Sequence, residues 1–303
     1  MNMSLSQIIE RFGEFPAIIS NLDKIPFSSP EESQAMAEEI LEDMHEGITA
    51  FLAVKAMNKT SVIGEELPIK TILQSTNRLS SFVLRNTKPG SGQVVLDTPY
   101  INLNLESDSA EKVTNATIAL GDGDGFVIPP AKKIFSNQSL DDEAINRIAT
   151  RFNRRSMQMK IENNTYIISA DNVLSLSFTD RNGREIEAKE TNEDICISFA
   201  SDPPPQETFA LVTGVYHVIN DVTFFGMNIP IKRLFYATII WFENSDILYG
   251  NTSAYVFKEE VDYSEEYRGY QFSVSPESNI TTTVCLCNHL TTFAEDKYAV
   301  GLQ

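Results

Sequence analysis

Cysteine, histidine and tryptophan are scarce in this 303-residue chain, with three, three and one residue respectively. The cysteines Cys196, Cys285 and Cys287 are too few and too unevenly spaced for a disulfide framework, and an odd number leaves at least one unpaired. They therefore do not decide the redox compartment. The histidines are few enough to be weighed one by one as catalytic residues.

Basic residues are also in short supply. Twenty-four lysines and arginines stand against forty-two acidic residues, which gives a net charge of -18. Such a charge repels a phosphate backbone, so nucleic acid is not expected as a partner. Good solubility explains the charge more simply than a role in binding cations or basic partners.

Long apolar runs and a signal peptide are missing as well. The longest nearly apolar stretches, Phe209 to Ile219 and Leu234 to Phe242, fall well short of the roughly 20 residues that a membrane span needs. Residues 1–15 lack the apolar core of a leader, so we expect that a leader was removed or that the chain is an excised piece.

Glycosylation sequons favour an extracellular location. They begin at Asn58, Asn115, Asn137, Asn163, Asn251 and Asn279, and also at Asn2.

Motifs of conventional enzymes do not occur. There is no phosphate-binding loop, nucleophile elbow or paired zinc-ligand motif, so neither a metal nor another cofactor is expected. The run Gly121-Asp122-Gly123-Asp124-Gly125 could suggest a calcium loop, but it lacks the later carboxylates of an EF-hand. We interpret it as a flexible turn.

The first third of the chain predicts helices. A long one begins at Pro30, where Glu31 and Glu32 favour the helix N-terminus, and its apolar residues recur at helical spacing as far as Leu52. Gly47 inside it costs about 1 kcal/mol relative to alanine. Shorter helices are predicted from Ser4 to Arg11 and from about Pro68 to Leu84. Together they predict a small bundle.

The pattern changes at residues 88–92, Lys-Pro-Gly-Ser-Gly, where we place a boundary between a helical subdomain (1–90) and a β-sandwich (91–303). Many short strands follow, with a hairpin turn at Arg181-Asn182-Gly183 and one short helix from Ser139 to Ala149. The fold class is therefore α+β, with helices first and a large antiparallel sandwich after them. The predicted strands are 93–96, 100–105, 117–120, 157–161, 173–178, 185–188, 195–199, 208–213, 222–225, 235–242, 255–257, 271–274 and 281–287.

The histidines differ in their surroundings. His45 lies among acidic residues of the long helix and is interpreted as a solvated surface residue, and His217 as structural. His289 stands in Cys285-Leu286-Cys287-Asn288-His289-Leu290-Thr291-Thr292-Phe293. A histidine two residues before a hydroxyl residue is common, so the residues by themselves do not establish catalysis.

This stretch, as Cys-x-Cys-x-His-Leu-Thr followed by Phe, resembles the GPCR proteolysis site (GPS motif, here 281–300) that closes the GAIN domain of adhesion receptors and polycystins. The family has a helical subdomain before a β-sandwich whose final strands carry the motif. The runs 173–178, 180–186, 194–198 and 216–220, and the polar middle of 291–300, look more like the polycystins than the adhesion G-protein-coupled receptors.

The resemblance implies a single self-cleavage between Leu290 and Thr291 rather than a turnover enzyme. His289 would take the proton of the Thr291 hydroxyl, whose oxygen would attack the Leu290 carbonyl, and water would hydrolyse the ester. Because a regular strand would hold residues 289 and 291 too far apart, the bond is expected in a kinked turn. Cys285, Cys287 and Phe293 would support the motif.

The partners implied are the chain's own C-terminal fragment, held as a strand, the membrane-spanning region of a larger protein and an unknown extracellular ligand. The site would lie on the extracellular face of a membrane. The sequence departs from the family in lacking the two upstream cysteines that pair with Cys-x-Cys; Trp241 stands alone, and Cys196 is either a cross-link or a buried small residue. A GAIN-like spacer or adhesion scaffold that never cuts is therefore the alternative, and an unrelated secreted β-sandwich the third.

Overall fold

A computed structural model describes most of the helical region and the framework of two sheets. The described residues are 4–22, 24–57, 69–121, 123–135, 144–152, 159–160, 165–188, 191–200, 208–217, 235–243, 246–248, 272–275, 277–278, 282–290 and 292–301. The predicted strands at 222–225 and 255–257 lie outside them.

Three long helices open the chain: α1 (Leu5–Leu22), α2 (Pro30–Met57) and α3 (Ile69–Asn86). α1 is longer than the predicted helix from Ser4 to Arg11, because Pro16 does not end it. The missing amide hydrogen of Pro16 is tolerated, and the Pro16 carbonyl accepts hydrogen bonds from the Ser20 hydroxyl (2.7 Å) and from Arg78 Nη1 of α3 (3.1 Å). None of the helices in the described ranges is long and apolar enough to span a bilayer.

Gly47 has a packing reason that the sequence did not reveal. A β-carbon at this position of α2 would lie 2.9 Å from Cζ of Phe12, which is buried on α1. The glycine therefore allows the two helices to approach closely, and this contact accounts for a residue that weakens the helix.

The larger sheet has the strand order β1-β2-β5-β7-β15-β10-β11-β12, with β6 and β8 also paired to β7. Every pairing in it is antiparallel. Its strands are β1 (Gln93–Asp97), β2 (Ile101–Asp108), β5 (Ile145–Phe152), β6 (Met159–Lys160), β7 (Thr165–Thr179), β8 (Glu185–Ile186), β10 (Thr208–His217), β11 (Phe235–Glu243), β12 (Asp246–Leu248) and β15 (Thr292–Gly301).

The smaller sheet has the order β13-β14-β9-β4-β3 and is also antiparallel. Its strands are β3 (Ala116–Ala119), β4 (Gly125–Ile128), β9 (Ile195–Ala200), β13 (Phe272–Val274) and β14 (Thr282–Cys287), and the short helices α4 (Ala110–Val113) and α5 (Ala131–Ile134) adjoin it in sequence.

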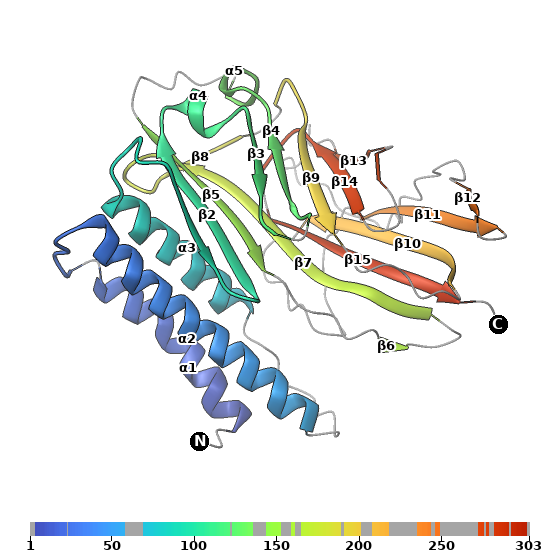
Figure 1. The fold of residues 1–303 in the computed structure, drawn as a ribbon, viewed down its shortest axis with the longest axis horizontal. Coiled ribbons are helices and arrows are strands. Elements are labelled where there is room, and N and C mark those ends of the chain that lie inside the picture. The colour runs from blue at the N-terminus through green and yellow to red at the C-terminus, as the bar shows by residue number, and fades with distance from the viewer. Residues whose placement is uncertain are drawn as a thin grey trace, which may run out of the picture.

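Helices α1, α2 and α3 lie against one face of the larger sheet and the smaller sheet lies against the other, as Figure 1 shows. Strand β5 displays this division, because its side chains alternate between two apolar clusters. Ile148 and Phe152 belong to the cluster that includes the helices, whereas Ile145 and Ala149 belong to the cluster between the sheets. The predicted α+β class is confirmed, with the helical region before the strands, and the predicted boundary at residues 90 and 91 falls between α3 and β1.

Strand β5 also corrects the predicted helix from Ser139 to Ala149. Residues 145–149 are strand, paired with β2 on one side and β7 on the other. The capping serine and the acidic residues that follow it favoured the start of a helix. Burial of both faces of β5 instead stabilises an extended strand, whose side chains alternate between the two faces. The turn at residues 181–183 is confirmed: it joins β7 to β8, and Gly183 has φ of 81°.

A buried ion pair ties the glycine–aspartate turn to the larger sheet. Asp124 is 2% exposed, pairs with the Arg151 guanidinium of β5 and accepts a hydrogen bond from the Ala200 amide of β9 at 2.7 Å. The turn therefore holds β4, β5 and β9 together, which is more than the flexible turn expected. Within the described residues no cluster of three or more histidine, cysteine, aspartate or glutamate side chains could hold a metal ion.

Candidate functional site

The segment around His289 connects the two sheets. β14 ends at Cys287 in the smaller sheet, between β13 and β9, and β15 begins at Thr292 in the larger sheet, between β7 and β10. The chain therefore passes from one layer of the sandwich to the other between the end of β14 and the start of β15, and residues 288–290 are not part of a strand. An extended ladder cannot continue through such a crossing, so the backbone bends here.

Two backbone hydrogen bonds hold the residues on either side of His289. The carbonyl of Asn288 accepts from the amide of Thr191 at 2.8 Å, and the amide of Leu290 donates to the carbonyl of Ala188 at 3.0 Å. Ala188 and Thr191 lie between β8 and β9, and both are buried. The segment before β9 therefore fixes the backbone of residues 288–290 from outside the motif.

The His289 side chain is almost fully enclosed, with 1% of its surface exposed. Its Nδ1 lies 3.2 Å from Oδ1 of Asn288, which is itself buried. When that oxygen accepts from Nδ1–H, the lone pair of the imidazole is on Nε2. Burial disfavours the charged ring and lowers the pKa of His289 to about 4, so the ring is neutral at pH 7.

Leu290 is half-buried and packs against the apolar cluster between the sheets. Thr291 lies outside the described residues. Phe293 is in β15, where its backbone pairs with Leu174 of β7 and His217 of β10. His289 and Leu290 thus lie in the connection that precedes β15, and β15 lies in the interior of the larger sheet.

None of the three cysteines forms a disulfide. Cys285 and Cys287 are buried between the sheets, and the Cys287 thiol lies 3.5 Å from the carbonyl of Ile195. Burial raises the pKa of Cys287 well above its ordinary value, and the pKa of Cys196 is raised chiefly by burial too. Both thiols are protonated at neutral pH, which disfavours them as nucleophiles. Cys196 is half-buried on β9, so it is neither a cross-link nor the fully buried small residue that was expected.

The other predicted residues are dispersed. His45 is half-buried, with its ring centroid 5.2 Å from that of Tyr100, so its interpretation as a solvated residue is wrong. His217 is in β10. Asn115 is exposed in the turn between α4 and β3, with φ of 49°, and is therefore accessible for glycosylation. The sequons at Asn58, Asn137, Asn163, Asn251 and Asn279 lie outside the described residues.

Three residues of the site were missed by the sequence analysis. Asn288 contacts His289, and its position next to that histidine could have identified it. Ala188 and Thr191 are about 100 residues away in sequence and act through their backbone groups, so no pattern of side chains predicts them.

No protein-family model matches this chain, and no curated protein matches it either.

Proposed function

We propose that this chain is an autoproteolytic module of the GAIN type that cleaves itself once between Leu290 and Thr291. The observation that carries the proposal is a buried histidine, neutral at pH 7, in the short connection between two packed sheets. A neutral imidazole can accept a proton, and a residue two positions later can reach it only where the backbone leaves the strand.

The reaction needs only groups of this chain and water. His289 takes the proton of the Thr291 hydroxyl, and the oxygen attacks the carbonyl carbon of Leu290. The bond from that carbon to the Thr291 nitrogen breaks as the nitrogen takes up the proton. Water then hydrolyses the ester, giving a carboxylate at Leu290 and restoring the hydroxyl.

The fixed backbone supports the rate of this reaction. Holding a hydroxyl beside its target carbonyl contributes about 7 to 11 kcal/mol, and a positioned base adds roughly 10²- to 10⁴-fold. The hydrogen bonds to Ala188 and Thr191 hold the peptide units around His289. The low pKa keeps the whole population of His289 in the basic form at pH 7, at the expense of intrinsic basicity.

The test is an intact mass of the denatured chain after expression in a secretory host. We expect the parent to lose the peptide that begins at Thr291, and Thr291→Ala and His289→Gln to remain whole. Thr292→Ala and His45→Gln are matched controls that remove a neighbouring hydroxyl and another histidine, and both should cut. An uncut parent that is folded by circular dichroism would refute the proposal.

A non-cleaving scaffold of the same type is the second candidate. Its specific support is that Cys285 and Cys287 are buried and form no disulfide, whereas family members of the common type use these positions for disulfides. The same mass measurement separates the two, because a scaffold gives one mass in every variant. A protein of either kind would belong to the extracellular part of a membrane protein.

A further inference from the structure

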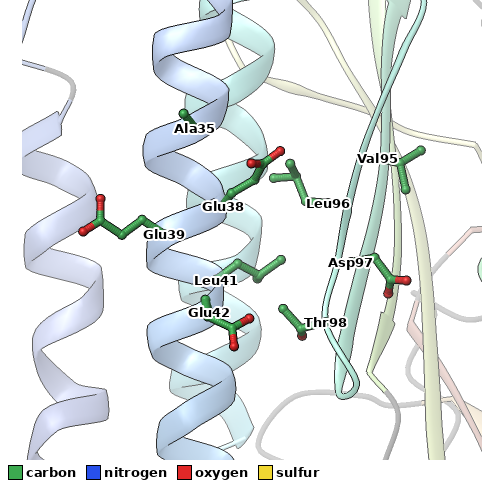
Figure 2. A pocket seen from close by; sticks show the side chains of 9 residues that line it. All are labelled: Ala35, Glu38, Glu39, Leu41, Glu42, Val95, Leu96, Asp97 and Thr98. Atoms are coloured by element: carbon green, nitrogen blue, oxygen red, sulfur yellow. The ribbon is translucent and has the colours of Figure 1, made fainter.

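Strand β1 forms an edge of the larger sheet and borders a groove on α2. Among the described strands, β1 pairs only with β2. The groove has a volume of about 590 Å³ and lies between α2 and β1, as Figure 2 shows. Leu41 and Leu96, each 1% exposed, form its apolar floor.

The hydrogen-bonding pattern identifies which backbone groups face outward. The amide of Thr98 donates to the carbonyl of Ile101 at 2.8 Å, so the backbone of Thr98 faces β2. The direction of the backbone hydrogen-bonding groups alternates along an antiparallel strand. The amides and carbonyls of Leu96 and Val94 therefore also point to β2. Those of Gln93, Val95 and Asp97 point away from it. These outward groups can accept another strand.

The charged side chains that line the groove beside β1 are acidic. Glu38 and Glu42 of α2 and Asp97 of β1 line the groove and are exposed, and no lysine or arginine among the described residues lines it. Within the described residues none of the three forms an ion pair. In Figure 2 the Glu38 carboxylate lies between α2 and Leu96.

The two sides of an added strand would meet different surfaces. Side chains that point to the helix side would meet Leu96 and the Glu38 and Glu42 carboxylates. Those on the opposite side would meet Val95, which is 50% exposed, and Asp97. A complementary segment therefore alternates basic and apolar residues. A second copy of this chain fits poorly, because its net charge is -18 and its own edge is acidic.

We propose that β1 and the α2 groove bind an extended basic segment of a partner protein by strand addition. Main-chain hydrogen bonds to residues 93, 95 and 97 give affinity, and the carboxylates select basic side chains. Acidic side chains on an edge also prevent pairing between copies of an acidic chain, and the same charges become attractive for a basic partner. The proposal is independent of self-cleavage.

The test uses a fluorescent peptide of alternating lysine and valine, acetyl-KVKVKVK-amide, and the full chain at pH 7. Fluorescence anisotropy should show saturable binding that weakens as salt is raised. Glu38→Gln/Glu42→Gln should weaken it about tenfold, since two exposed ion pairs are lost. Glu10→Gln/Glu14→Gln removes the same charge from exposed positions of α1 and should leave the affinity unchanged.

Two further probes test the strand pairing. Val95→Pro removes an outward amide without removing a hydrogen bond to β2, and it should abolish binding. The same peptide with N-methyl groups on alternate residues cannot donate along one edge and should not bind, which keeps the test valid if the proline variant misfolds. No binding to the parent chain, equal weakening in both glutamine variants, or full binding of the methylated peptide would overturn the proposal.

Discussion

His289 couples the site to the stability of the sandwich. Its folded pKa of about 4 lies below the ordinary value of 6.5. Between those two pH values the unfolded chain binds more protons at this residue than the folded chain does. The free energy of unfolding therefore rises with pH through that window, and falls as pH is lowered from 6.5 to 4.

We predict that this residue contributes about 3 kcal/mol to the difference in unfolding free energy between pH 6.5 and pH 4, at 1.36 kcal/mol per unit of pKa. Urea unfolding of Thr291→Ala, with and without His289→Gln, measures it in a chain that does not cut. The carboxylates that titrate in the same range are common to both proteins and cancel in the difference. Parallel curves for the two proteins would show that His289 is not buried in its neutral form.

At the scale of elements, two glycines of the helical region have opposite surroundings. A β-carbon added to Gly13 of α1 would have nothing within 4 Å, whereas a β-carbon on Gly47 of α2 would meet the Phe12 ring at 2.9 Å. Both replacements by alanine gain helix propensity, so the difference between them reports the contact.

We predict that Gly13→Ala stabilises the chain by about 0.5 to 1 kcal/mol and that Gly47→Ala destabilises it by about 1 kcal/mol, because overpacking a core costs about 1 to 3 kcal/mol. Thermal or urea unfolding of the two variants gives the comparison. Stabilisation by Gly47→Ala would mean that α1 and α2 can separate without loss.

Strand β5 shows why local signals fail for some elements. Residues 139–143 combine a helix-capping serine with acidic residues, and this favoured a helix that would run to Ala149. The strand from Ile145 instead supplies apolar residues to both clusters and ladder bonds to β2 and β7. Both of these neighbouring strands lie outside the local window of sequence from which a helix or strand is predicted.

For the whole molecule, the position of β15 decides what a cut would do. β15 is paired along its length with β7 and β10 in the interior of the larger sheet. A cut between Leu290 and Thr291 removes one covalent bond and leaves both ladders in place. Backbone hydrogen bonds contribute about 0.5 to 1.5 kcal/mol each, so the two ladders together favour retention.

We predict that the cleaved fragments remain together under native conditions. On size-exclusion chromatography the C-terminal peptide should elute with the rest of the chain, and in urea it should be released only as the whole sandwich unfolds. The uncut Thr291→Ala chain is the control for the unfolding midpoint. A peptide lost from the folded protein in native buffer would contradict the pairing of β15.

The sequence by itself determined the α+β class, the helical region before the strands, the turn at residues 181–183 and the motif around His289. These follow from local periodicity, from turn chemistry and from a short motif. Only the tertiary structure decided that β5 is a strand, that Gly47 allows a helix contact and that His289 is buried beside Asn288 with its backbone held by Ala188 and Thr191. Burial and backbone hydrogen bonds between distant segments depend on how the layers pack, and no local pattern of residues encodes them.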